Sequence, residues 1–337
     1  MGTIDTPLQS ATPTTKPTEG ELTLLTNMLR IRRLEELCAE LYTQEKIRGF
    51  LHLYIGEEAV ATGVMSHVRP QDNVLATYRE HGHALLKGIP ARSIMAEMFG
   101  KVTGCCRGRG GSMHLFSRAH RFFGGQAIVS AGLPQAVGLG LAAQWLAEDR
   151  ITFCFLGDGS VAEGEFHEAL NLASLWRVPV LFCCENNFYA MGTALEKHQA
   201  QTNLVEKAAS YKVPGLTIDG MDVDAVSAGT QQALQFMQTH HSPFFLEFKT
   251  YRFRPHSMFD PDLYRSKAEI AAWKERCPIE SKKAALYRSG VLTDDRMEFL
   301  EKIVADELKD AVEYAEQSPF EKPEELTHFV YSSGGSI

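Results

Sequence analysis

The chain has 337 residues, of which 44% are hydrophobic and 23% charged, the usual balance of a globular protein with a large core. Its formal net charge of −8 argues against nucleic acid or an anionic membrane as the main partner. The seven cysteines include two adjacent pairs and no CxxC motif. They indicate reduced thiols in the cytoplasm rather than a disulfide framework or a zinc site.

The first 20 residues differ in composition from the rest of the chain. Residues 1–20 are rich in Thr and Pro, with neither the apolar stretch of a signal peptide nor the arginines of a transit peptide. We expect a disordered leader there, one domain over 21–332 and a tail at 333–337. At the start of the domain, apolar residues at helical spacing predict a helix over 21–45.

Three weaker signals follow the first helix. A short strand is expected over 73–78. Residues 105–125 mix glycine with arginine and are expected to form a loop suited to an anion. Residues 124–147 carry no charge but are interrupted by Gly, Pro and Gln, so a buried helix is expected rather than a membrane span.

Strands and helices alternate through the middle of the chain. Apolar runs predict strands at 151–156, 178–184, 215–218 and 244–253. Helical spacing predicts helices at 164–175 and 224–240, and a polar helical region from 267 onward. Near-continuous apolar strands separated by helices are typical of a parallel sheet buried on both faces. The predicted fold class is therefore α/β, a parallel sheet flanked by helices on both faces, with helical N- and C-terminal extensions.

Two polar motifs follow neighbouring predicted strands, Gly-Asp-Gly at 157–159 and Glu-Asn-Asn at 185–187. Ligands of an open parallel sheet bind beyond the carboxyl ends of its strands, so the Asp158 and Asn187 side chains are expected to meet there. A carboxylate and a carboxamide are hard oxygen ligands suited to Mg²⁺ or Ca²⁺. The glycines and the following helix start offer backbone N–H groups to a diphosphate. The motifs predict a metal-bridged diphosphate site.

These motifs and several other segments resemble one enzyme family. The further segments lie at 49–54, 77–82, 109–114, 219–222 and 250–253. From about residue 22 to 332 the chain is similar to alpha subunits of the thiamine-dependent first component of two-oxoacid dehydrogenases, above all the pyruvate type. The resemblance implies a thiamine-diphosphate-binding fold and two cofactors, thiamine diphosphate and Mg²⁺.

The resemblance also implies roles for particular residues. Asp158, Asn187 and the backbone carbonyl of Tyr189 match the Mg²⁺ ligands of the family. The positions that match cofactor contacts are Tyr78, Arg79, Ala127, Val129, Asp158, Gly159, Ser160, Asn187 and Met191. In that set, an arginine is suited to the diphosphate because its fork pairs with phosphate oxygens. His52 and His256 match the catalytic histidines that face the reacting carbon.

The activity implied is oxidative decarboxylation of pyruvate, with transfer of the acetyl group to the lipoyl domain of the dihydrolipoyl acetyltransferase component. In this family a glutamate that activates the cofactor lies on the beta subunit, and the chain has no second α/β unit to supply it. We therefore expect a heterotetramer of two alpha and two beta subunits, with the cofactor at their interface.

Alternatives in substrate and class stay open at this point. The segments 110–114 and 256–258 favour pyruvate, whereas Glu163 points weakly to branched-chain 2-oxoacids, and acetoin is a third substrate. A noncatalytic subunit that binds a Mg²⁺-nucleotide is a rival from another class, disfavoured by the joint presence of two histidines and Met191. Pro255 stands where the family usually has Gly, which leaves the conformation of its loop open.

Overall fold

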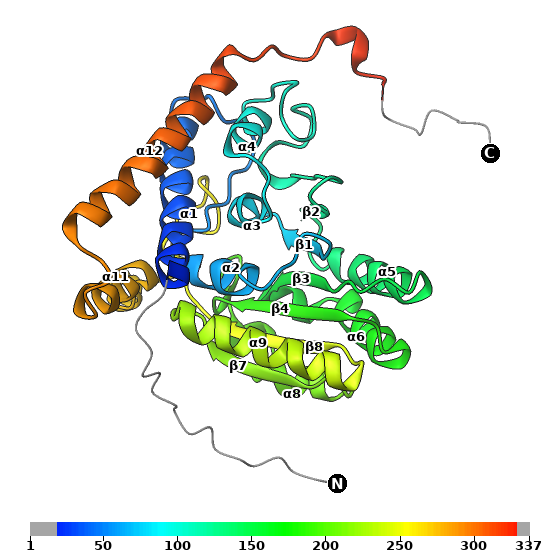
Figure 1. Ribbon diagram of the computed structural model, residues 1–337. Helices are drawn as coiled ribbons and strands as arrows, with labels where there is room; N and C mark the ends of the chain where they lie inside the picture. The colour runs from blue at the N-terminus through cyan, green and yellow to red at the C-terminus, as the bar shows by residue number, and fades with distance from the viewer. Residues whose placement is uncertain (1–18, 329–337) are drawn as a thin grey trace.

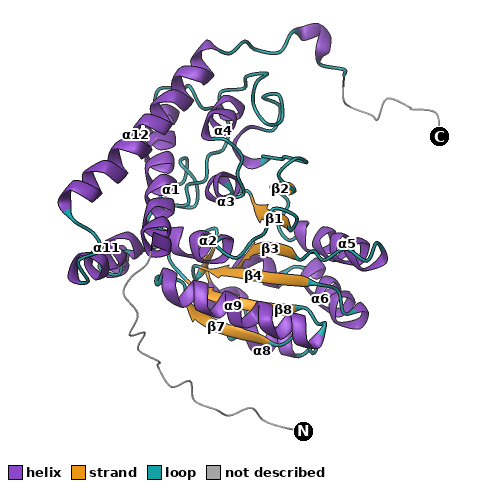
Figure 2. Ribbon diagram, in the orientation of Figure 1, coloured by secondary structure: helices purple, strands orange, loops and turns teal. Residues whose placement is uncertain are grey.

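The computed structural model describes residues 19–328, and these residues fold around a six-stranded parallel sheet (Figures 1 and 2). The strand order is β2-β1-β3-β4-β8-β7, and each neighbouring pair is parallel. Most of the leader expected at 1–20, and the whole tail at 333–337, lie outside the described residues. The first helix begins at Glu19, so the expected leader overlaps it by two positions.

The elements have the following bounds. The sheet consists of β1 (Asn73–Thr77), β2 (Phe122–Gln126), β3 (Thr152–Gly157), β4 (Val180–Asn186), β7 (Gly215–Asp219) and β8 (Phe244–Lys249), and β5 (Tyr189–Ala190) forms an antiparallel hairpin with β6 (Thr193–Ala194). The helices are α1 (Glu19–Thr43), α2 (Glu58–Met65), α3 (His81–Leu86), α4 (Ala91–Met98), α5 (Gly132–Trp145), α6 (Gly164–Trp176), α7 (Leu195–His198), α8 (Leu204–Ala209), α9 (Val223–His240), α10 (Lys267–Lys274), α11 (Pro278–Arg288) and α12 (Asp294–Gln317). Three short 3-10 helices are η1 (Gly111–Met113), η2 (Asp158–Ala162) and η3 (Pro323–Glu325).

Both faces of the sheet are buried, and strand β4 shows how. Leu181 and Cys183 belong to the hydrophobic cluster that includes side chains of α1, α2, α4, α9 and α12. Phe182 and Cys184, which point the other way because side chains alternate along a strand, belong to the cluster that includes α5, α6 and α8. The predicted parallel sheet between two helical layers is confirmed.

The predicted strands and helices of the middle region are confirmed with small shifts at their ends. The exception is β8, which ends at Lys249 rather than at 253. The chain leaves the sheet there, and the N–H of Phe253 donates instead to the carbonyl of Ile55. The polar C-terminal region is helical as expected, and α12 runs beside α1 (Figure 1), where Arg30 forms an ion pair with Glu307 at 2.6 Å.

Two predictions for residues 105–147 need correction. The segment 105–125 is not only loop, because it contains η1 and most of the edge strand β2. Two glycines interrupt the apolar pattern of this strand in the sequence. One of them, Gly125, packs directly against the carboxyl group of Glu80. The helix α5 is buried on one face only, since it covers the sheet from outside, and Trp145 is exposed. Among residues 19–328, no helix is long and apolar enough to cross a membrane.

Strand order fixes where a ligand can bind. The connection that follows β1 leads to β2 on one side, whereas β3 and β4 lie on the other side of β1. The loops that leave β1 and β3 therefore diverge, and a crevice opens between the carboxyl ends of these strands. Thr77 ends β1 and Gly157 ends β3, so the segments 77–79 and 157–160 border this crevice.

Candidate active site

A cavity of about 230 Å³ lies at this crevice. Its lining comes from the ends of β1, β3 and β4, from the segment 126–133 at the end of β2, from the β5–β6 hairpin, from the loop after β8 and from Glu57. The predicted site residues that line it are Tyr78, Arg79, Val129, Asp158, Gly159, Ser160, Asn187, Tyr189, Met191 and His256. Residues more than 170 positions apart in the chain thus converge on one space, which supports the site predicted from the two strand-end motifs.

Two predicted residues are placed less directly. Ala127 is half-buried and lies between lining residues without lining the cavity itself. His52 lies one layer behind the lining, with its ring centroid 4.5 Å from that of Tyr78 and 4.9 Å from that of His256. The role of each site residue toward a cofactor stays a prediction.

The predicted metal ligands sit at the ends of paired strands. Asp158 follows β3 and is 1% exposed, yet its Oδ2 has no hydrogen-bond partner among residues 19–328. The nearest basic group is Nε2 of His198, at 3.6 Å. The Nδ2 group of Asn187 donates to Oε1 of Glu57 at 3.0 Å. A buried carboxylate oxygen without a hydrogen-bond donor is suited to bind a cation.

The backbone next to Asp158 is built for close approach. A Cβ added at Gly159 would lie 2.9 Å from the Cβ of Ala190, so only glycine brings η2 and the hairpin this close. Ser130 and Met191 border the same cavity with φ of 69° and 54°. A positive φ is costly for residues with a Cβ and often marks a functional site.

Two buried arginines give the cavity a positive character. Arg79 donates to the carbonyl of Leu53 at 2.6 Å and to that of His256 at 2.8 Å, so it joins the segments that carry both histidines. Burial, and then the charge of Arg252, lower the pKa of Arg79. Arg252 donates to the carbonyl of Met191 at 3.0 Å. Its Nη1 has no hydrogen-bond partner within the described chain, which leaves a donor for an anion.

The two histidines are held neutral. Burial, and then the charge of Arg79, lower the pKa of His52 to about 2 and the pKa of His256 to about 3. Each imidazole therefore offers one N–H donor and one acceptor nitrogen near neutral pH. The Nδ1 of His52 is buried without a hydrogen-bond partner in the part of the chain that the structure describes.

Two buried carboxylates that the sequence did not single out complete the cavity. Glu57 is 1% exposed, and burial raises its pKa to about 7. Its Oε2 lies 3.7 Å from Nε of Arg79. Glu185 accepts hydrogen bonds from the hydroxyl of Tyr54 and from Nε2 of His83, the latter at 3.0 Å. Only Glu185 carried a sequence signal, as the first residue of the Glu-Asn-Asn motif.

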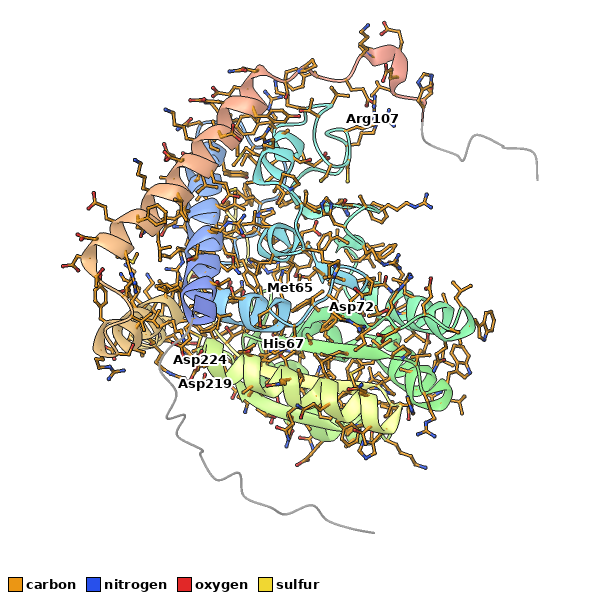
Figure 3. The ribbon with its side chains drawn as sticks, in the orientation of Figure 1. Met65, His67, Asp72, Arg107, Asp219 and Asp224 are labelled. Carbon is orange, nitrogen blue, oxygen red and sulfur yellow. The ribbon has the colours of Figure 1, made fainter. Side chains whose placement is uncertain are left out.

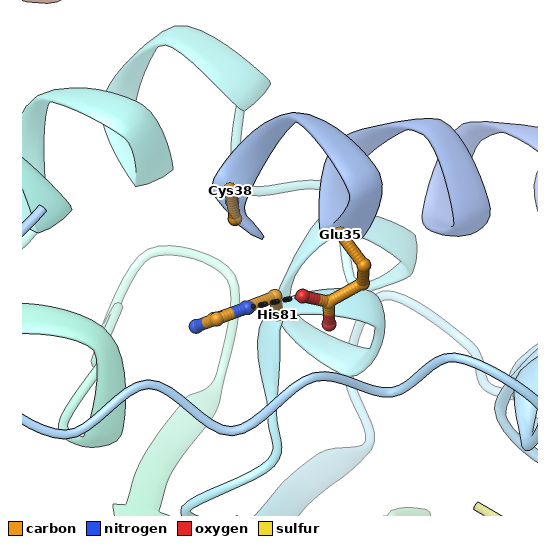
Figure 4. A group of neighbouring side chains, drawn as sticks. All are labelled: Glu35, Cys38 and His81. Atoms are coloured by element: carbon orange, nitrogen blue, oxygen red, sulfur yellow. Dashed lines mark hydrogen bonds and ion pairs between the residues drawn. The ribbon is translucent and has the colours of Figure 1, made fainter. Parts of the chain in front are cut away.

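A buried hydrogen-bond chain anchors the segment that carries Tyr78 and Arg79. His81 contacts Glu35 of α1 at 2.9 Å through Nδ1 (Figure 4) and Ser112 Oγ at 2.8 Å through Nε2. Cys38 lies beside this pair. Hydrogen bonds already occupy the ligand atoms of the glutamate and the histidine, so the cluster serves as a structural link between α1 and the loop around η1.

A second carboxylate organises the glycine-rich loop itself. Buried Glu97 accepts four backbone N–H groups, from Cys106 at 2.7 Å, Gly108 at 2.8 Å, Gly110 at 2.7 Å and Gly111 at 3.2 Å. The loop extends toward the C-terminal segment, where Arg107 (Figure 3) pairs with acidic side chains of residues 321–325. The arginines of this loop thus hold the C-terminal segment and do not line the cavity, contrary to the expected anion-binding loop.

The loop around Pro255 is tied down by side chains. The N–H of His256 donates to Asp260 Oδ2 at 3.0 Å, and Arg265 donates to the carbonyls of Arg252 at 2.7 Å and Arg254 at 2.9 Å. These bonds hold the histidine over the cavity with proline before it.

Comparisons with known proteins agree on one family. A sequence model of the family described as "Dehydrogenase E1 component" matches residues 26–324. The chain is similar to proteins named "Pyruvate dehydrogenase E1 component subunit alpha". The one from Rickettsia bellii is 40% identical over 305 residues, which cover 90% of this chain and 94% of the relative. Those from Porphyra purpurea (41% over 318 residues, 92% of each chain) and Zymomonas mobilis (43% over 301 residues, 89% of this chain and 85% of the relative) are similar too.

Proposed function

The chain belongs to the dehydrogenase E1 component family, and from this premise we propose that it is the alpha subunit of a pyruvate dehydrogenase E1 component. The reaction is the thiamine-diphosphate-dependent oxidative decarboxylation of pyruvate, with transfer of the acetyl group to the lipoyl group of the dihydrolipoyl acetyltransferase. The observation that carries the proposal is the cavity between the carboxyl ends of β1 and β3. It is lined by Asp158, Asn187 and two buried arginines.

The residues present fit thiamine diphosphate with Mg²⁺. Asp158 Oδ2 and Arg252 Nη1 are buried polar atoms without a hydrogen-bond partner within the described residues, and they suit a cation and an anion respectively. Asp158, Asn187 and the carbonyl of Tyr189 would hold Mg²⁺, whose preferred ligands are oxygens. Tyr78, Arg79 and the backbone at 159–160 would hold the diphosphate.

The remaining assigned contacts come from the segment after β2 and from the β5–β6 hairpin. Ala127 and Val129 would meet the aminopyrimidine through their backbone, with Ala127 set back from the lining. Met191 would support the bent shape of the cofactor, held in place by the bond from Arg252 to its carbonyl. The left-handed backbone at Met191 is the kind of strain that functional sites carry.

When bound, thiamine diphosphate supplies the electron sink that lets carbon dioxide leave a 2-oxoacid. His256 faces the cavity and His52 supports it from behind, and as neutral imidazoles each can donate one proton and accept another. The positive charge of Arg79 and Arg252 contributes to the low pKa of each histidine. Negative charge bound beside these arginines therefore raises the histidine pKa values toward the range in which general acid–base catalysis is effective.

We propose a beta subunit as the partner that completes the site. A volume of about 230 Å³ is below the roughly 300–1,000 Å³ of typical small-molecule sites. At the rim, Ile128 is 71% exposed and Met191 is 66% exposed. An open cavity with an exposed apolar rim favours a partner surface over it. The assembly proposed is a heterotetramer of two alpha and two beta subunits, which serves the lipoyl domain of the acetyltransferase.

The names of the relatives bear on the substrate, and the cysteines bear on the compartment. The relatives compared above are named for pyruvate, which does not favour branched-chain 2-oxoacids, acetoin or a noncatalytic nucleotide-binding subunit. All seven cysteines have free thiols, which favours a reducing compartment, and we propose the cytoplasm.

A thermal-shift experiment on the two-subunit enzyme tests the proposal. Thiamine diphosphate with Mg²⁺ should raise the melting temperature, because a ligand that binds only the folded state stabilises it, whereas ATP with Mg²⁺ should not. Asp158→Ala should abolish the shift. An equal shift with ATP would favour a nucleotide-binding subunit, and an unchanged shift in Asp158→Ala would remove this residue from the site.

A further inference from the structure

We propose that Glu57 is a positioning residue that turns the carboxamide oxygen of Asn187 toward the metal and couples this ligand to Arg79. The inference rests on the proposed function and adds a residue to it. Glu57 contacts both halves of the site at once. Its Oε1 accepts from Asn187 Nδ2 at 3.0 Å, and its Oε2 lies 3.7 Å from Arg79 Nε.

The local backbone leaves the Glu57 carboxylate available for this task. Glu57 precedes α2 at the N-cap position, and its side chain makes no capping bond to the helix. Its backbone is fixed instead, because its N–H donates to the carbonyl of Tyr54 and its carbonyl accepts from Val60. The next residue, Glu58, has the structural role, since it accepts the N–H of Gly56 and pairs with Arg32. Two adjacent buried glutamates therefore point to different partners.

A carboxylate fixes the orientation of an amide that contacts it. A carboxyl oxygen that carries no proton only accepts hydrogen bonds, so the NH₂ end of Asn187 faces Oε1 of Glu57 and its carbonyl oxygen faces away. The preceding asparagine shows the same arrangement, with Asn186 Nδ2 donating to buried Glu247 at 2.7 Å. There the freed oxygen accepts the N–H of Phe188 at 3.1 Å. At Asn187 the freed oxygen receives, among residues 19–328, only the long contact from Tyr189 N–H, at 3.4 Å.

The second oxygen of Glu57 connects the metal side to the histidine side. Its neighbour Arg79 donates to the carbonyls of Leu53 and His256. Leu53 directly follows His52, so Arg79 contacts the backbone at both histidines. Oε2 has no hydrogen-bond partner among residues 19–328, so its interaction with the guanidinium is one of charge at 3.7 Å. A single carboxylate thus aligns a predicted metal ligand and faces the arginine predicted to bind the diphosphate.

The test compares Glu57→Ala and Glu57→Gln with wild type in the two-subunit enzyme. Calorimetric titration with Mg²⁺ at saturating thiamine diphosphate gives the metal affinity directly. Loss of a residue that orients a ligand typically costs about tenfold to hundredfold in metal affinity, which is expected for Glu57→Ala. Glu57→Gln should lose less, because its side-chain oxygen can still accept from Asn187, although its NH₂ end also permits the flipped amide. Glu168→Ala, which removes an exposed glutamate of α6, is the matched control.

A double-mutant cycle separates positioning from a general effect on the fold. In the Asn187→Ala background, Glu57→Ala should cause no further loss of Mg²⁺ affinity, because its target is gone. Equal losses in both backgrounds, or wild-type affinity in Glu57→Ala, would overturn the inference while wild type still binds both cofactors. A wild-type enzyme that binds no Mg²⁺ with thiamine diphosphate would instead refute the proposed function. The melting temperature without cofactors reports the fold of each variant separately.

Discussion

Replacing His52 by asparagine should make the cofactor-free protein less sensitive to acid. Burial and the nearby arginine hold the pKa of His52 at about 2 in the folded state, whereas an unfolded histidine titrates near about 6.5. Below that higher value the unfolded chain gains a proton that the folded protein does not bind. Stability is therefore fully present above about pH 6.5 and is lost as the pH falls from there toward the folded pKa.

The size of the effect depends mainly on the unfolded pKa. Between about pH 7 and about pH 5, a histidine that stays neutral in the folded state costs about 2 kcal/mol of unfolding free energy. His256, with a pKa of about 3, adds a similar amount. In His52→Asn the loss on acidification should be smaller than in wild type by about 2 kcal/mol.

Urea denaturation at the two pH values measures this difference. For each protein, the change in unfolding free energy between the two pH values is measured. The value for the variant is then subtracted from that for wild type, so that contributions from titrating groups unaffected by the substitution cancel. His240→Asn, at the exposed end of α9, controls for the loss of a histidine from the surface. Equal acid sensitivity in wild type and His52→Asn would refute the claim that this histidine is held neutral by its surroundings.

Two further substitutions test the scaffold around the site. Gly56→Ala should lower the unfolding free energy by about 1–3 kcal/mol, because Gly56 has a φ of 105° and an added Cβ would lie 2.4 Å from the carbonyl of Tyr251; an unchanged urea midpoint would contradict this. Glu97→Ala removes the acceptor of four backbone N–H groups, so trypsin should cleave after Arg107 or Arg109 about tenfold faster than in wild type. Cleavage at the wild-type rate would show that the loop is held by other contacts.

The sheet and the meeting of Asp158 and Asn187 at its edge were predictable because their signals are local. Apolar runs marked β3 and β4, and the two polar motifs at their ends placed Asp158 and Asn187 beside each other once the strands paired. The edge strand β2 was missed because Gly124 and Gly125 carry no side chain to show alternation. The need for glycine at position 125 comes from a residue elsewhere in the chain, because the carboxyl group of Glu80 fills the space beside Gly125.

The supporting residues of the site could not be predicted, because their meaning depends on tertiary contacts. A pair of glutamates at 57–58 reads as an ordinary helix start, and only the structure separates the one that faces Asn187 from the one that pairs with Arg32. The prediction of an anion-binding loop around Arg107 and Arg109 was wrong for the same reason. Arginines among glycines suggested an anion site, but the two side chains contact the acidic C-terminal segment.

Turnover of pyruvate by the co-expressed two-subunit enzyme tests the central claim most directly. With thiamine diphosphate, Mg²⁺ and an artificial electron acceptor, pyruvate should reduce the acceptor faster than branched-chain 2-oxoacids or acetoin do. The chain purified without its beta subunit should show no comparable rate. Full thiamine-dependent decarboxylation by the chain alone would contradict the shared active site, and preference for another substrate in the assembled enzyme would contradict its assignment to pyruvate.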